Sequence, residues 1–300
     1  MRILVTGATG FIGNRLANAL VAAGHEVRTT GVDGENPFHI SKAYLGNIIG
    51  DIAESRLLKG VEAVFHQAAN NDPQDTNLHR MFKANVSNTA DLFEWLYKWG
   101  CRTFIYASST AVYGSEPSPY IEGITKENPL TPYAYSKLAM EHYVAVLSKV
   151  HADAKFLGLR YCNVYGPGEA HKGKRASMIH QMIKALKAGE KVRLFKDGQQ
   201  ARDWVHVDDV VQANLKALDS NFSNEIVNIG SGGHVTFNHL FDTISAMLCV
   251  ESDIEYIDNS YESTYQTLTQ CDIQKARKLL GYEPIFGTHA GLKHYIENWS

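Results

Sequence analysis

The sequence predicts an α/β protein with a doubly wound parallel sheet, followed by a smaller mixed α/β domain. Through the first half of the chain, short apolar runs alternate with segments of helical periodicity. Such alternation is typical of βαβ units, which set parallel strands side by side with helices on both faces. A glycine-rich turn also joins the first apolar run to the first helical segment, as in Rossmann-type sheets.

The elements follow one another in a regular order up to residue 162. Strands are expected at residues 3–5, 26–30, 61–66, 103–107 and 155–161, and helices at 11–23, 75–99 and 133–150. Beyond this point the strands become shorter, so we predict a first domain over 1–162 and a second over 163–300. Residues 203–219 again have the pattern of a strand and a helix, which predicts a return of the chain to the first domain.

Composition and charge exclude several classes of protein. An apolar share of 44% and a net charge of −3 exclude a disordered chain, and no nucleic-acid partner is expected. The four cysteines are far apart without metal-ligand spacing, so no metal is expected and a reducing compartment fits. No apolar run approaches the ~18 residues of a membrane span, and the first strand leaves no room for a signal peptide. A cytoplasmic location without membrane contact is therefore expected.

The turn after the first strand has the spacing of a phosphate-binding loop. Gly7, Gly10 and Gly13 enclose Phe11 and Ile12, where a strand ends and an amphipathic helix begins. Glycines at these points let the backbone approach a pyrophosphate at the helix N-terminus. The alternative is a tight turn without a ligand. The strand-turn-helix context favours a dinucleotide, so the first domain is predicted to bind NAD or NADP.

Residues after the second strand bear on the choice between the two dinucleotides. An acid that binds the adenosine ribose is expected about 20 residues after the last glycine, where Asp33 lies. The usual strand register of this fold would place the acid two residues earlier, where this chain has Gly31. Arg28 or Lys42 could instead bind the 2′-phosphate of NADP. Asp51 and Ile52 have the pattern of a strand end that contacts adenine, although an ordinary turn has the same pattern. NAD and NADP both stay open at this stage.

Three side chains form a candidate catalytic group. Tyr133 and Lys137 are four residues apart at the start of a helical segment, so both lie on one face. A neighbouring ammonium favours the phenolate of a tyrosine, whose pKa is ordinarily ~10, and Lys137 would also reach the nicotinamide ribose. Ser109 follows a buried strand and is the candidate hydroxyl that orients the substrate. The alternative is chance spacing on an amphipathic helix beside a serine that ends a strand.

Together these motifs resemble the extended short-chain dehydrogenase/reductase superfamily, and its nucleotide-sugar epimerases in particular. The motifs are TGATGFIG at 6–13, FHQAA at 65–69, Asn85, YASSTAVYG at 106–114, PYAYSK at 132–137, RYCNVYGP at 160–167 and RDWVHVDDV at 202–210. The resemblance implies a cofactor lined by Gln67, Ala68, Ala69, Asn70, Asn85 and Val164. It also implies that Asn163 and Arg202 hold the diphosphate of a nucleotide sugar, which makes the second domain a substrate-binding domain.

The residues after Ser109 bear on the reaction. Dehydratases of this superfamily carry acids there, whereas this chain has Thr110 and Ala111, neither of which can protonate a leaving hydroxyl. The 3,5-epimerase/reductase branch requires a cysteine that neither Cys101 nor Cys162 supplies at the corresponding place. An epimerase acting through a transient keto intermediate is therefore expected.

The second half of the chain resembles the ADP-glyceromanno-heptose 6-epimerase branch. The similar runs are NVYGPGEAHKGKRAS at 163–177, RLFKDGQQARDWVHV at 193–207 and TYQTLTQCDI at 264–273. The resemblance implies that Lys172 works opposite Tyr133, and that Lys174, Phe195, Arg202 and Tyr265 contact the substrate. The basic residues around Lys172 could instead form a solvated loop or contact phosphates, and Tyr265 could be a packed surface aromatic.

Other functions stay open on the sequence. Thr264 replaces an arginine often found in the heptose branch, so an NDP-hexose 4-epimerase of the UDP-glucose or UDP-GlcNAc type is the first alternative. A nucleotide-sugar ketoreductase shares the same catalytic group. A non-catalytic protein that senses dinucleotides is the alternative outside enzymes. The amphipathic segments 75–99 and 133–150 could expose apolar flanks to a second copy, so a homo-oligomer is expected.

Overall fold

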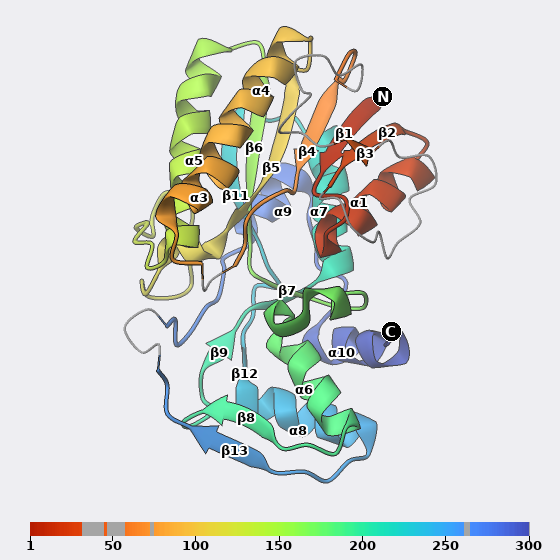
Figure 1. Ribbon diagram of the computed structural model, residues 1–300, viewed down its shortest axis with the longest axis vertical. Helices are drawn as coiled ribbons and strands as arrows, with labels where there is room; N and C mark the ends of the chain where they lie inside the picture. Colours follow the sequence, from red (N-terminus) through yellow and green to blue (C-terminus); the bar gives the residue numbers. More distant parts are fainter. Residues whose placement is uncertain (32–44, 47–57, 73–74, 261–264, 300) are drawn as a thin grey trace.

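The chain is built around a seven-stranded parallel sheet (Figure 1). The computed structural model describes residues 1–31, 45–46, 58–72, 75–260 and 265–299. Across the sheet the order is β11-β6-β5-β4-β1-β2-β3, which confirms the predicted fold class. The strands are β1 (Arg2–Thr6), β2 (Glu26–Thr30), β3 (Leu45–Gly46), β4 (Ala63–His66), β5 (Thr103–Ser109), β6 (Lys155–Tyr161) and β11 (Asn224–Ile229).

Helices cover both faces of the sheet because successive strand residues point to opposite sides. In β1, Ile3 and Val5 belong to one hydrophobic cluster and Leu4 to the other. The first cluster packs under α1 (Phe11–Ala22), α7 (Val207–Asp219) and α9 (Gln274–Leu280). The second packs under α4 (Asn88–Lys98) and α5 (Pro132–Val150), on the other side in Figure 1. The sheet is therefore buried on both faces, as its continuous apolar strands predict.

The helix predicted at 75–99 is interrupted and begins later than predicted. It consists of α3 (Leu78–Phe82), a π-helical turn η1 (Lys83–Ser87) and α4. Asp75 is not helical because its carboxylate accepts hydrogen bonds from the Asn77 backbone N–H and from Arg80. Asn77 then caps the helix by accepting from the Arg80 backbone N–H. The polar side chains around Asp75 therefore form a turn that the periodicity did not reveal.

A smaller group of elements packs below the sheet in the view of Figure 1. Three strand pairs belong to it: β7 (Asn163–Tyr165) with β10 (Trp204–His206), β8 (Val192–Phe195) with β13 (Ile254–Ile257), and β9 (Ala201–Arg202) with β12 (Val235–Thr236). They pack with α6 (Met178–Lys187), α8 (Phe237–Leu248) and α10 (Thr288–Glu297) around a third apolar cluster. Close packing requires Gly291 in α10, because a Cβ there would lie 2.0 Å from the Tyr165 hydroxyl.

The predicted return at 203–219 differs in detail from the structure. Helix α7 packs against α1 and β5, but β10 pairs with β7 and does not join the large sheet. The sheet instead receives β11, which pairs with β6 after α7. The division into domains at residue 162 stays a prediction. Among the described helices, none is both long and apolar enough to cross a membrane.

Candidate active site

A cleft of about 740 Å³ opens at the carboxyl ends of β1, β4, β5 and β6. This is where sheets of this class bind ligands, because the connections diverge there. The cleft brings together residues from the glycine turn, the end of β4, the end of β5, α5 and the segment 164–175. Fourteen of the predicted site residues line it: Gly7, Gly10, Phe11, Ile12, Gly13, Gln67, Ala68, Ala69, Asn70, Ser109, Tyr133, Lys137, Val164 and Lys172.

The glycine turn fits the pyrophosphate of a dinucleotide. Gly7 has a φ of +67°, and a Cβ there would lie 2.7 Å from the Ala68 backbone nitrogen. A Cβ on Gly13 would lie 2.3 Å from the Gly7 carbonyl oxygen, so helix α1 touches the turn backbone to backbone. In the described part of the chain, no side chain caps the N-terminus of α1. Its first N–H groups are therefore available to an anion.

Three of the predicted cofactor residues, Asp33, Asp51 and Ile52, lie outside the residues that the structure describes. Gly31 lies in the cleft wall, where a Cβ would come 2.4 Å from the Thr9 side chain. The end of β2 therefore packs closely against the glycine turn.

Tyr133, Ser109 and Lys137 converge in the cleft. Burial raises the pKa of the Tyr133 phenol, and its hydrogen bond with Ser109 lowers it. The Lys137 Nζ lies 5.8 Å from the centre of the Tyr133 ring and donates a 2.8 Å hydrogen bond to the Ala107 carbonyl. Burial lowers the pKa of Lys137 to about 8. The ammonium is therefore oriented by β5, and it stays largely protonated at neutral pH.

The position of Ser109 follows from the length of β5. The strand is two residues longer than predicted and pairs with β6 residue by residue, Ser109 opposite Tyr161. Directly after it, η2 (Thr110–Tyr113) begins, and the Ser109 Oγ accepts from the Ala111 backbone N–H. Ser109 thus lies at the tip of a central strand, where pairing and capping fix its backbone.

Asn85 is not among the residues that line the cleft, and its contact with the cofactor stays a prediction. It is buried in η1, and its amide both donates to the Asn70 carbonyl and accepts from the Asn70 backbone N–H. It also donates 2.9 Å to the Ser136 Oγ of α5. The π-helical turn directs this side chain inward, so Asn85 fixes the cleft wall at Asn70 from behind.

Lys172 lines the cleft from η3 (Ala170–Arg175). Its Nζ is 3.3 Å from the fully buried carboxylate of Glu169 and 5.0 Å from the centre of the Phe11 ring. Glu169 also accepts hydrogen bonds from the Ser177 backbone N–H and hydroxyl, both 2.7 Å long. The carboxylate therefore holds Lys172 beside the glycine turn.

The remaining predicted substrate residues lie outside the cleft lining. Phe195, Arg202 and Tyr265 form a second group, in which the Arg202 guanidinium stands 4.9 Å from the Tyr265 ring centre and the two rings are 5.3 Å apart. Asn163 donates to the Thr269 hydroxyl, 3.1 Å away. Lys174 lies in η3 without reaching the cleft. Substrate contact by these five residues stays a prediction.

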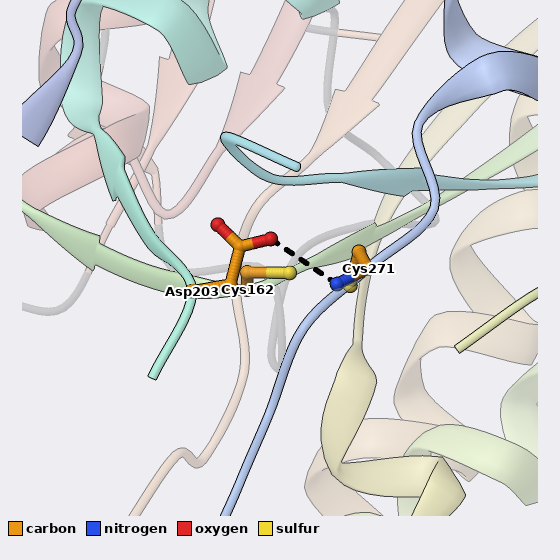
Figure 2. Close-up of side chains that lie close together, drawn as sticks. All are labelled: Cys162, Asp203 and Cys271. Atoms are coloured by element: carbon orange, nitrogen blue, oxygen red, sulfur yellow. Dashed lines mark hydrogen bonds between the residues drawn. The ribbon is translucent and has the colours of Figure 1, made fainter. Parts of the chain in front are cut away.

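Cys162, which lines the cleft, lies close to Asp203 and Cys271 (Figure 2). Their ligand atoms are within 4.8 Å of one another. The Asp203 carboxylate, however, accepts from the Ser231 N–H and hydroxyl and from the Gly232 and Cys271 N–H groups. These four bonds occupy the lone pairs of both oxygens. Asp203 therefore acts as a tie between backbone segments.

Sequence reasoning missed three buried side chains around the cleft. His66 lines it and bonds the hydroxyls of Thr6 and Thr89, at 2.8 and 2.9 Å. Burial lowers the pKa of His66 to about 3, so it is neutral. Glu141 and Glu169 are the other two. Glu141 had a sequence signal, since it follows Lys137 by one helical turn.

Known proteins resemble this chain in sequence and in fold. Over residues 3–230 the sequence matches the NAD dependent epimerase/dehydratase family. It is 34% identical to an ADP-L-glycero-D-manno-heptose-6-epimerase of Alkalilimnicola ehrlichii, over 98% of this chain and 96% of the relative. The crystal structure of a Thermotoga maritima UDP-glucose 4-epimerase with UDP-glucose has a TM-score of 0.91 at 30% identity, over 99% of this chain and 98% of that chain. A Bacillus cereus UDP-glucuronic acid 4-epimerase with UDP-glucuronic acid and NAD has a TM-score of 0.87 at 26% identity, over 99% and 98%.

These matches confirm the superfamily resemblance and the expectation of an isomerase-type enzyme. They also confirm a nicotinamide dinucleotide as cofactor, since the family is NAD-dependent. The glycine turn, the strand-tip serine and the Tyr133–Lys137 pair lie in one cleft, as this chemistry requires. The chain belongs to the NAD-dependent epimerase/dehydratase family.

Proposed function

We propose that the protein inverts one carbon of a sugar linked to a nucleotide diphosphate, through a keto intermediate. The observation that carries this proposal is the convergence of Ser109, Tyr133 and Lys137 in the same cleft as the glycine turn. A hydroxyl, a phenol and an ammonium that line one cleft suit proton transfer from a sugar alcohol. The glycine turn supports NAD as the partner in hydride transfer.

Each side chain has a separate task in this mechanism. Tyr133 takes the proton of the sugar hydroxyl, Ser109 orients that hydroxyl, and Lys137 stabilises the phenolate. NAD bound at the glycine turn supplies a hydride acceptor and, once reduced, the donor for the return step. Between the two steps the keto sugar rotates in the site, so that the hydride returns to the other face of its carbonyl group. Net redox is zero, and Tyr133 regains its original protonation state.

The sugar is proposed from the relatives and from the loop that carries Lys172. An NDP-heptose 6-epimerase is the first candidate, because the run at 163–177 resembles that branch and its His171 and Lys172 line the cleft. A UDP-hexose 4-epimerase is the second candidate, because the fold superposes on the UDP-glucose 4-epimerase with a TM-score of 0.91. Both candidates use the same proton-transfer group on different carbons.

Incubation with a panel of nucleotide-activated heptoses and hexoses tests this proposal. NMR of the products is expected to show inversion at one carbon of one sugar class, with no net change in NADH absorbance during turnover. Accumulation or consumption of NADH would instead identify a dehydrogenase or ketoreductase. NAD binding without turnover of any sugar in the panel would favour a dinucleotide-sensing protein. Either result would overturn the proposed epimerase.

We propose further that Lys172 is the second proton donor, opposite Tyr133. The Lys172→Met variant is then expected to lose about 10²-fold in kcat with an unchanged Kd for NAD. Loss of a phosphate contact would instead weaken NAD binding and spare kcat. Stopped assays and calorimetric titration with NAD separate the two. Lys184→Met, on the exposed side of α6, is the matched control and is expected to behave as wild type.

A homo-oligomer remains part of this proposal. Helix α5 exposes Tyr135, Val146 and Val150, which offers an apolar flank to a second copy.

A further inference from the structure

Behind the cleft, a buried carboxylate joins three elements of the sheet domain. Glu141 of α5 accepts from the Arg160 Nε at 2.9 Å and from the Arg160 Nη2 at 2.6 Å, in a two-pronged ion pair with β6. The Ser108 Oγ of β5 donates to the same carboxylate at 2.5 Å. The side chains of Glu141 and Arg160 are each only 4% exposed. Charge and hydrogen bonds are therefore concentrated where α5 crosses β5 and β6.

This cluster continues the catalytic group in a regular way. Tyr133, Lys137 and Glu141 are spaced by four residues, so they occupy three successive turns of one face of α5. Each binds β5: Tyr133 pairs with Ser109, Lys137 with the Ala107 carbonyl, and Glu141 with the Ser108 hydroxyl. Three consecutive residues of the strand thus hold three consecutive turns of the helix. Glu141 is the last of these three along α5, and its side chain is the acidic one.

Of the groups that face Lys137, Glu141 is the one whose charge raises the pKa of Lys137. From β4, His66 faces Lys137 but is neutral, since burial lowers its pKa to about 3. From its own helix, the Tyr133 ring centre lies 5.8 Å from the Lys137 Nζ, and the Glu141 side chain follows Lys137 by one helical turn. Among the described residues, Glu141 supplies the charge that raises the pKa of Lys137 against the larger effect of burial, which lowers it to about 8.

Arg160, the ion-pair partner of Glu141, is itself held by two further residues. Arg160 stacks 4.7 Å from the Tyr113 ring centre and makes its second ion pair with Glu127, 3.0 Å away. The Tyr106 hydroxyl near the pair is buried, and its pKa is raised mainly by burial, so it stays neutral. A buried ion pair of this kind adds little net stability compared with apolar packing. Because Glu141 lies one helical turn from Lys137, its negative charge acts on the Lys137 ammonium.

We propose that Glu141 is a positioning residue: clamped by Arg160 and Ser108, it fixes α5 on β5 and keeps the Lys137 ammonium charged in the cleft. This inference rests on the proposed function in assigning Lys137 a part in proton transfer. The charge of Lys137 itself is measurable without any substrate.

Titration of lysine labelled with ¹³C at Cε tests the proposal by NMR. Lys137→Met identifies the Lys137 signal. Glu141→Gln is expected to lower the titration midpoint of Lys137 by about one pH unit or more, since an adjacent opposite charge is lost. Glu127→Gln is the matched control, because it removes the other carboxylate of Arg160, away from α5, and is expected to leave the midpoint unchanged.

A second variant keeps the test decisive if an unpaired Arg160 prevents folding. In Glu141→Gln/Arg160→Met both members of the ion pair are removed, so the Glu141–Arg160 site no longer holds a buried charge without its partner. A smaller fall of the midpoint in the same direction is expected. An unchanged midpoint in either folded variant would overturn the proposal. In active enzyme, the alkaline limb of kcat is expected to move to lower pH by the same amount as the NMR midpoint. A shifted midpoint in a protein that epimerises no sugar would overturn the proposed function alone.

Discussion

Replacement of Tyr133 by phenylalanine is expected to lower kcat by about 10³-fold while the Kd for NAD stays unchanged. The half-buried phenol faces Ser109 at the strand tip, where Ser109 lowers its pKa, and it takes the sugar proton in the proposed mechanism. Phenylalanine preserves the ring beside Lys137 and removes only the hydroxyl. Turnover is measured by NMR of the sugar product, and cofactor affinity by calorimetric titration.

Tyr135→Phe is the matched control for this variant. Tyr135 lies on the same helix but is 51% exposed, so loss of its hydroxyl is expected to change neither kcat nor Kd. Activity of Tyr133→Phe within tenfold of the wild type would show that another group takes the proton. Loss of NAD binding in Tyr133→Phe would mean that the hydroxyl holds the cofactor instead.

Gly13→Ala is expected to reduce both stability and cofactor binding. The added Cβ would lie 2.3 Å from the Gly7 oxygen and 2.8 Å from the Gly7 carbonyl carbon, which are backbone atoms. Helix α1 must therefore move away from the turn that receives the pyrophosphate. Overpacking of this kind costs about 1–3 kcal/mol, so a Tm lower by roughly 2–5 °C is expected for a chain of this length. The Kd for NAD is expected to rise by about tenfold or more, since 1.4 kcal/mol is one factor of ten.

The control is a glycine whose Cβ would have room. At Gly233 the nearest atom to an added Cβ, the Ser231 Oγ, is 3.9 Å away. Gly233→Ala is therefore expected to keep the wild-type Tm and Kd within error. Thermal denaturation and titration with NAD measure both variants. Equal Tm and Kd in Gly13→Ala and the wild type would contradict the close approach of helix and turn.

Elements with local signals could be predicted from the sequence. The strands at 26–30 and 155–161 were found at the predicted residues, since apolar runs bounded by turns are recognisable within a few positions. The helix predicted at 75–99 began at Leu78 and contained a π-helical turn, because Asp75 and Asn85 find partners that periodicity does not describe. Prediction therefore failed where polar side chains bind the backbone.

By itself the sequence determined the parallel sheet, the glycine turn and the one-turn spacing of Tyr133 and Lys137. These depend on contacts between near neighbours, whose geometry is fixed by helix and strand periods. Only the tertiary structure decided that Arg160 pairs with Glu141 and that β11 joins the sheet beside β6. It likewise decided which predicted residues line the cleft. Such pairings join distant segments, and their choice depends on the packing of the whole core, which no local pattern contains.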